Sequence, residues 1–257
     1  MTSTPPPTAT PQQAADLRKD LEAAGWGVDT VRHALGEVAD AALRREVRLP
    51  ALLAVRAGLA EDRAAGATPS PIALLTALFM LGEPVAAAEL DTALRRTRTR
   101  DAVAMGLVTE PDDDGMVRAL VDLRPHEAGD AKGEVRWWVA SDLGELTTGR
   151  ALEPDHVLGI GGAGLTLAAL TPRTPVRTAL DLGCGCGIQT LYLLRHAQHV
   201  TATDISERAL AFTAFNAALA GTEEGRLELL AGSFLEPVAG RRFDLIATNP
   251  PFVITPP

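Results

Sequence analysis

The feature that most constrains the fold is Ala179–Gly187, where an apolar run passes directly into three alternating glycines. The apolar run predicts the end of a buried strand, and a helix is expected after it, from about Ile188 to Arg195. Gly183, Gly185 and Gly187 let the backbone turn sharply and approach a ligand, because no Cβ stands in the way. A helix N-terminus behind the turn offers N–H groups to a polar or anionic ligand. The stretch therefore predicts a cofactor-binding loop.

The spacing around this loop indicates which cofactor it holds. The dinucleotide fingerprint needs its third glycine one position later, where this chain has Ile188, so the spacing leans away from NAD. A second strand is expected at His199–Thr203, and Asp204 follows it, 21 residues after Gly183. That distance is expected for one βαβ unit, and a carboxylate at this position can accept both hydroxyls of an adenosine ribose.

Three segments in this order resemble class I S-adenosylmethionine (SAM) methyltransferases. Asp181–Gly187 resembles the first family motif, Thr201–Asp204 the second strand with its terminal acid, and Phe243–Phe252 the fourth strand followed by Asn-Pro-Pro-aromatic. The resemblance covers roughly residues 174–255, well under half of the chain. It implies an α/β fold in which residues 174–257 form the first half of a Rossmann-like SAM methyltransferase domain.

The resemblance also implies the cofactor contacts. Asp204 would bind the ribose, Ile205 would pack on the adenine, and Asp181 would reach the amino end of SAM, often through water. Many relatives carry Asp where this chain has Ser233, whose hydroxyl would hold the adenine amine or leave that contact to backbone groups. The residues assigned to SAM are Asp181, Gly183, Gly185, Gly187, Asp204, Ile205, Ser233 and Phe234.

The Asn-Pro-Pro-Phe segment predicts the reaction. The side-chain carbonyl of Asn249 and the backbone carbonyl of Pro250 can hold both hydrogens of a planar NH₂ group, with the nitrogen aligned for attack on the sulfonium methyl. Pro250 and Pro251 fix φ, so the loop is rigid before the substrate arrives. Phe252 can stack on a flat amide or base. These four residues are the expected catalytic set.

Two substrate classes fit this chemistry. One is a protein glutamine amide, as in the release-factor glutamine methyltransferases that share the signature. The other is an exocyclic amine of adenine or guanine in nucleic acid, which enzymes acting on duplexes must flip out of the stack. The net charge of −9 slightly favours the protein substrate, because binding to phosphates needs an array of basic residues.

The N-terminal half is expected to be helical. Residues 1–13 are Pro/Thr-rich and uncharged, which predicts a disordered tail. Residues 14–135 contain short helical patterns and an Asp-Gly hairpin signal within Asp112–Gly115. Three helices and a hairpin are typical of a winged helix, which would contact nucleic acid through Arg95, Arg96, Arg98 and Arg100 at the start of the third helix. The alternative is a scaffold or protein-docking module, since three aspartates at the wing tip would repel phosphates.

Finer expectations concern residues 50–173. A helix beginning at Pro50 is expected to turn Leu52, Leu53 and Leu59 inward. Glu127–Glu134 is expected to be a polar loop. Residues 136–173 are expected to connect the domains and to cover the cofactor.

Composition excludes several classes. The chain has only two cysteines, both in the glycine loop, which excludes a disulfide framework; a lone Cys-x-Cys gives poor support for zinc. The longest apolar runs, Ile72–Leu81 and Val157–Leu170, are too short to cross a bilayer core of about 30 Å. No signal peptide opens the chain, so a cytoplasmic protein without membrane contact is expected.

The short stretch of sequence after Phe252 affects the activity expected of this chain. The chain stops five residues after Phe252, whereas a class I methyltransferase continues for three more strands. We expect the sequence to be part of a longer enzyme, and residues 1–257 alone to have weak or no activity. The alternative is a noncatalytic SAM-binding or interaction module.

Overall fold

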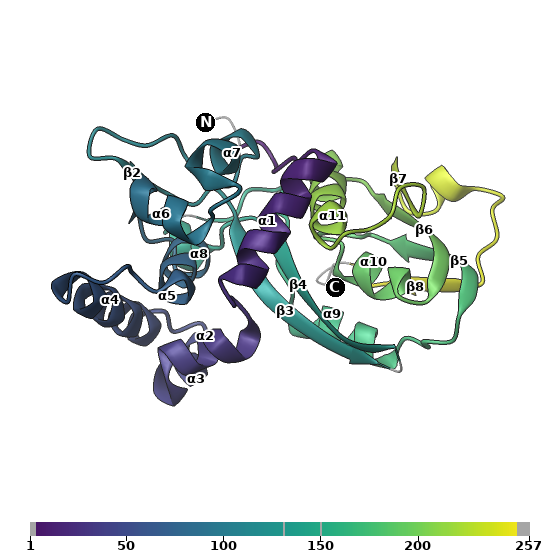
Figure 1. The fold of residues 1–257 in the computed structure, drawn as a ribbon. Coiled ribbons are helices and arrows are strands. Elements are labelled where there is room, and N and C mark those ends of the chain that lie inside the picture. The colour runs from purple at the N-terminus through teal and green to yellow at the C-terminus, as the bar shows by residue number, and fades with distance from the viewer. Residues whose placement is uncertain (1–3, 131, 150, 251–257) are drawn as a thin grey trace. The chain divides into compact units, whose positions relative to one another are not determined.

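The computed structural model describes residues 4–130, 132–149 and 151–250. The chain divides into two compact units, Met1–His156 and Val157–Pro257 (Figure 1). The boundary lies within the segment expected to be a connection, residues 136–173, and assigns its first part to the N-terminal unit.

The N-terminal unit is mainly helical, as expected. Its helical elements are α1 (Pro11–Ala23), α2 (Val28–Leu35), α3 (Glu37–Leu43), α4 (Leu49–Ala64), α5 (Pro71–Leu75), the π-helical segment η1 (Thr76–Met80), α6 (Ala87–Ala93), α7 (Arg98–Ala104) and α8 (Glu145–Thr148). Several ends follow local signals. Ser70 caps α5 by accepting from the N–H of Ala73, and Gly25 and Gly106, both with positive φ, follow α1 and α7.

Helix α1 begins at Pro11, inside the segment expected to be a disordered tail. The hydroxyl of Thr10 accepts from the N–H of Gln13 at 3.3 Å, and Gln13 Oε1 accepts from the N–H of Thr10 at 3.0 Å. This capping box and a proline at the first helical position start the helix without any apolar residue. Thr8 N also donates to Met105 O at 3.0 Å. The expected tail of residues 1–13 is therefore too long.

The core of the N-terminal unit centres on α5 and η1. Trp26 and Trp138 are fully buried, and both indole N–H groups are satisfied: Trp26 donates to Thr76 Oγ1 at 3.0 Å and Trp138 to Trp26 O at 2.8 Å. On α4, Leu52 and Leu59 are buried as expected. The expectation for Leu53 was wrong: it is 57% exposed, because it lies outside the helix face that these residues share.

Strands β3 (Asp122–Asp130) and β4 (Gly133–Ser141) form a long antiparallel ribbon (Figure 1). The expected polar loop at Glu127–Glu134 was wrong, because most of this segment continues the two strands. Glu127 lies opposite Arg136, whose Nε donates to Glu127 Oε1 at 2.9 Å. Such a cross-strand ion pair lets polar residues occupy the solvated part of the ribbon, whereas Trp137 and Trp138 are buried farther along β4.

The two strands of a small sheet flank helices α6 and α7 in the sequence. Strand β1 (Val85–Ala86) pairs with β2 (Met116–Val117), and Val108 bridges to Ala119. The expected hairpin is present: Asp112 Oδ1 accepts from the N–H of Met116 at 2.9 Å and closes the turn. The order helix, β1, α6, α7, hairpin is compatible with a winged helix, and that assignment stays a prediction.

The C-terminal unit has the predicted Rossmann-like character. Its elements are α9 (Gly162–Leu170), β5 (Val176–Leu182), α10 (Ile188–Leu194), β6 (Ala197–Asp204), α11 (Glu207–Leu219), β7 (Leu227–Ala231), η2 (Glu236–Val238) and β8 (Leu245–Thr248). The strands are parallel and ordered β7-β6-β5-β8. The chain leaves β5 toward β6 on one side and returns to β8 on the other. In open sheets, ligands bind outside the carboxyl ends of strands at such a switch point.

Among the described residues, no helix combines the length and apolar character needed to cross a bilayer.

Candidate cofactor and acceptor site

The glycine loop between β5 and α10 is anchored to β6. The N–H groups of Gly183 and Cys184 donate to the carbonyl of Thr203 at 2.8 and 3.0 Å. Gly183 and Gly185 have φ of +77° and +55°, and a Cβ on either would meet nothing within 4 Å, so side-chain space is open there. A Cβ on Gly187 would lie 2.8 Å from Thr213 Oγ1. Gly187 therefore permits a close approach of the loop to α11.

Asp204, at the carboxyl end of β6, joins two loops. Its Oδ2 accepts from Gly185 N at 3.0 Å, and its Oδ1 accepts from Ser206 N at 2.9 Å. Helix α11 is capped by Ser206, whose hydroxyl accepts from Ala209 N at 3.2 Å, rather than by Asp204. Because each carboxylate oxygen has a second lone pair, Asp204 can hold the glycine loop and still accept two ribose hydroxyls.

Two large apolar side chains are exposed beside Asp204. Ile205 is 77% exposed directly after β6, and Phe234 is 64% exposed three residues after β7. Gly232 N donates to Asp204 O at 3.0 Å, which joins the ends of β6 and β7. Phe234 also has a strained φ of +50°. The Asp204 carboxylate, exposed Ser233 and the two apolar side chains have the chemistry that the adenosine portion of SAM requires, and their contacts with it stay predictions.

Asp181 is enclosed rather than open. It is 1% exposed, and Thr190 Oγ1 donates to its Oδ2 at 2.6 Å. Burial raises the pKa of Asp181 from 3.8 to about 6, although the bonds from Thr190 oppose this shift. Asp181 therefore fixes the start of α10, and its contact with the amino end of SAM stays a prediction.

Helix α11 supports the glycine loop through two polar side chains. Thr213 Oγ1 donates to Gly185 O at 3.0 Å, and Asn216 Nδ2 donates to Cys186 O at 2.8 Å. Thr213 is 1% exposed and Asn216 is 0% exposed. The sequence analysis did not find Asn216, although a polar residue three positions after Thr213 on a buried helix face could have signalled it.

The two cysteines belong to this loop. Both are free and buried, and burial raises the pKa of each thiol, that of Cys186 to about 11. Neither is a thiolate at neutral pH, and the thiolate is the form that binds zinc. The part of the chain that the structure describes contains no group of three or more His, Cys, Asp or Glu side chains able to hold a metal.

The segment expected to bind the acceptor follows β8, next to β5. Leu182 lies opposite Thr248, and Thr248 Oγ1 donates to Leu182 O at 2.9 Å. The next residues, Asn249 and Pro250, are exposed. Pro251 and Phe252 lie outside the described residues.

The remaining candidates belong to the N-terminal unit. Arg95, Arg96, Arg98 and Arg100 are all exposed and lie between the end of α6 and the first turn of α7.

Family models match parts of both halves of the chain. Residues 161–255 match the family model "Methyltransferase small domain", and residues 23–120 match a model described as a domain of unknown function. A release factor glutamine methyltransferase from Cereibacter sphaeroides is 46% identical over 92 residues, which are 35% of this chain and 32% of that protein. A ribosomal RNA small subunit methyltransferase C from Escherichia coli is 39% identical over 92 residues, which are 35% of this chain and 26% of that protein. The match thus spans a third or less of these relatives.

A solved precorrin 8w decarboxylase from Methanobacterium thermoautotrophicum covers 38% of this chain and 53% of its own, with 24% identity and a TM-score of 0.33. Nothing about activity follows from so low a score.

Residues 161–255 therefore match the methyltransferase small domain, and this match indicates SAM as the cofactor.

Proposed function

We propose that this chain supplies the cofactor-binding half and the acceptor-binding segment of a SAM-dependent N-methyltransferase that acts on a planar NH₂ group. The pairing of β5 with β8 carries the proposal. Because Leu182 lies opposite Thr248, the glycine loop and Asn249 leave neighbouring strands at the same edge of the sheet.

Some residues at this edge would bind the cofactor, and others would bind the substrate nitrogen. Asp204 and the apolar surface of Ile205 and Phe234 would hold the adenosine portion of SAM, which supplies an electrophilic methyl group when bound. The side-chain carbonyl of Asn249 and the backbone carbonyl of Pro250 would accept hydrogen bonds from the two N–H groups of the substrate's NH₂. Both hydrogen bonds would lie in the plane of that NH₂ group. One face of the nitrogen is then free for in-line attack on the methyl carbon. As the nitrogen forms its bond to the methyl carbon, the carbon–sulfur bond breaks and its electron pair stays on sulfur, which leaves as a neutral thioether. The nitrogen then loses one of its protons to water.

The hydroxyl of Thr248 contributes to this alignment. By donating to Leu182 O at 2.9 Å, it fixes the residue before Asn249 to the strand that carries the glycine loop. Asn249 would therefore be oriented by β5 as well as by its own strand. Misplacement of an acceptor by about 1 Å can cost about 10²-fold in rate.

Two acceptors remain candidates, and each has its own support. The net charge of −9 supports a protein glutamine amide. The four exposed arginines of the N-terminal unit support an amine of a nucleic-acid base. A cytoplasmic location is part of the proposal.

The test separates cofactor binding from transfer. Calorimetric titration of residues 1–257 with SAM measures binding without any need for turnover. In the complete natural protein, Asn249→Ala is expected to bind SAM as the wild type does and to lose methyl transfer. Retained turnover in that variant would refute the role given to Asn249, and no SAM binding by the wild-type chain would refute the proposal.

The acceptor is identified with methyl-labelled SAM and an extract of cells that lack the enzyme. Label released by protease indicates a glutamine amide, and label released by nuclease indicates a base amine.

A further inference from the structure

Four arginines project from one short segment of the N-terminal unit. We call residues Leu94–Arg100 the arginine turn; it links α6 to α7 and has the sequence Leu-Arg-Arg-Thr-Arg-Thr-Arg. Its three other residues are buried, while every arginine is exposed. The turn itself contains no carboxylate. The chain therefore concentrates positive charge at one place in a protein whose net charge is −9.

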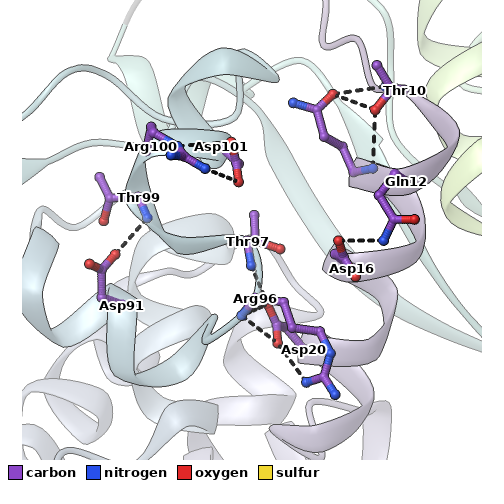
Figure 2. A network of polar contacts seen from close by, with 11 residues as sticks. Thr10, Gln12, Asp16, Asp20, Asp91, Arg96, Thr97, Thr99, Arg100 and Asp101 are labelled. Atoms are coloured by element: carbon purple, nitrogen blue, oxygen red, sulfur yellow. Dashed lines mark hydrogen bonds and ion pairs between the residues drawn. The ribbon is translucent and has the colours of Figure 1, made fainter.

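The backbone of the arginine turn is held from beneath by two carboxylates. Asp20 of α1, 1% exposed, accepts from Arg96 N at 2.9 Å and from Thr97 N at 2.8 Å. Asp91 of α6 accepts from Thr99 N at 2.7 Å (Figure 2). The turn is thus ordered before any ligand arrives, which lowers the entropic cost of binding one.

The guanidinium groups are mostly available for a ligand. Among the described residues, Arg95 and Arg98 have no carboxylate partner; Arg95 Nε lies 3.4 Å from Thr92 O. Arg96 lies 3.7 Å from Asp20, and Arg100 pairs with its neighbour Asp101 at 3.3 Å. The Arg100–Asp101 pair lies at the surface, and such pairs are weak and exchange readily for other anions.

Arg98 has a strained backbone conformation. Its φ is +52°, in the left-handed region that glycine or asparagine occupies more easily. Arg98 N nevertheless donates to Leu94 O at 2.7 Å, so the conformation is part of the folded turn. The chain keeps an arginine where a smaller residue would be less strained, which favours a role for its side chain.

We propose that the arginine turn binds the phosphate backbone of a nucleic acid. The planar guanidinium matches phosphate in a bidentate geometry, and several arginines on one rigid turn can reach successive phosphates. The acidic hairpin tip at Asp112–Asp114 opposes contact there, so binding is centred on the turn and is sensitive to salt. If all four arginines contact phosphates of duplex DNA, the slope of log K against log salt is no steeper than about −3.6.

This inference deepens the proposed function, because it selects the base amine over the glutamine amide as acceptor. It rests on contacts in the N-terminal unit alone. Its test needs neither SAM nor turnover, so its failure is distinguishable from failure of the proposed methyl transfer.

The experiment is a fluorescence-anisotropy titration of residues 1–257 with a labelled RNA hairpin, a single-stranded RNA and a DNA duplex at several salt concentrations. The variant is Arg95→Gln with Arg98→Gln, both on the surface. The control is Arg44→Gln with Arg45→Gln, which removes the same charge from exposed arginines after α3.

The turn variant is expected to lose at least about tenfold in affinity and to flatten the duplex salt slope by about 1.8, while the control stays within about twofold. Lysine at positions 95 and 98 is expected to restore the slope. Absence of binding by the wild-type chain at low salt, or an equal loss in both double variants, would overturn the proposal. Displacement of the nucleic acid by poly-glutamate at equal charge would also overturn it, since the surface would then bind any polyanion.

Discussion

Replacement of Asp20 by asparagine tests how the N-terminal unit is held together. In the wild type, Oδ2 of this buried carboxylate accepts from the N–H groups of Arg96 and Thr97 at 2.9 and 2.8 Å, and Oδ1 also accepts from Arg96 N at 3.2 Å. Asparagine has nearly the same shape, but only one acceptor oxygen and no charge. With its oxygen in the place of Oδ2, asparagine would still accept from both N–H groups, but its NH₂ group would then face Arg96 N. The amide donor would be left without that acceptor in a site that is 1% exposed.

The expected cost follows from these two losses. A hydrogen bond to a charged group contributes about 1.5–3 kcal/mol, and an unsatisfied buried donor costs about 1–3 kcal/mol. Together they predict a loss of about 3–5 kcal/mol in the free energy of unfolding. With a denaturant slope of about 2 kcal/mol per molar urea, the unfolding midpoint should fall by about 1.5–2.5 M.

The tryptophans provide an assay specific to this unit. All three, Trp26, Trp137 and Trp138, lie in Met1–His156 and are buried, whereas Val157–Pro257 has none. Tryptophan fluorescence during urea unfolding of the whole chain therefore follows the N-terminal unit alone.

Asp16→Asn is the matched control. Asp16 lies on the same helix and accepts from Gln12 Nε2 at 2.7 Å near the surface, so a change within about 0.5 kcal/mol is expected. If both variants shift the midpoint equally, the buried carboxylate does not stabilise the arginine turn, and the reasoning fails.

Three further predictions concern the methyltransferase domain. Asp204→Ala should weaken SAM binding at least about tenfold by calorimetry, with exposed Glu207→Ala as control; unchanged affinity would remove Asp204 from the ribose site. Because the pKa of Asp181 is raised to about 6, its carboxyl becomes protonated as the pH falls through that value, and an ionised carboxylate is what an ammonium group requires. SAM affinity should therefore fall about tenfold between pH 7.5 and 5 in the wild type but not in Asp181→Asn, and parallel pH profiles would rule out this contact. Asn216→Leu should lower SAM affinity while circular dichroism stays native, because the loop carbonyl loses its donor; full affinity would show that α11 does not shape the loop.

Much of the C-terminal unit could be predicted because its signals are local. The apolar run that begins at Ala179 is the end of β5, as expected, and the glycines after it mark the loop. Ser206 begins α11 through an ordinary serine cap. Leu210, Thr213 and Ala217 lie at helical spacing in the sequence, and all three are buried.

The features that were missed depend on partners far away in the sequence. Glu127 belongs to a strand because Arg136 lies opposite it, and nothing local to Glu127 reports that pairing. Asn216 acquires its role only when the loop that contains Cys186 folds over α11. The start of α1 was a different failure: the capping box between Thr10 and Gln13 was present in the sequence, and composition was given too much weight.

The placement of the two cysteines has an experimental consequence. Cys184 and Cys186 are the only thiols in the chain, and both are buried and protonated within the glycine loop. An alkylating reagent can react only when the loop opens, so the labelling rate measures how often it opens. A ligand that closes over the loop should slow that rate in proportion to its occupancy. The two native thiols therefore report how often the cofactor loop opens, and no engineered probe is needed.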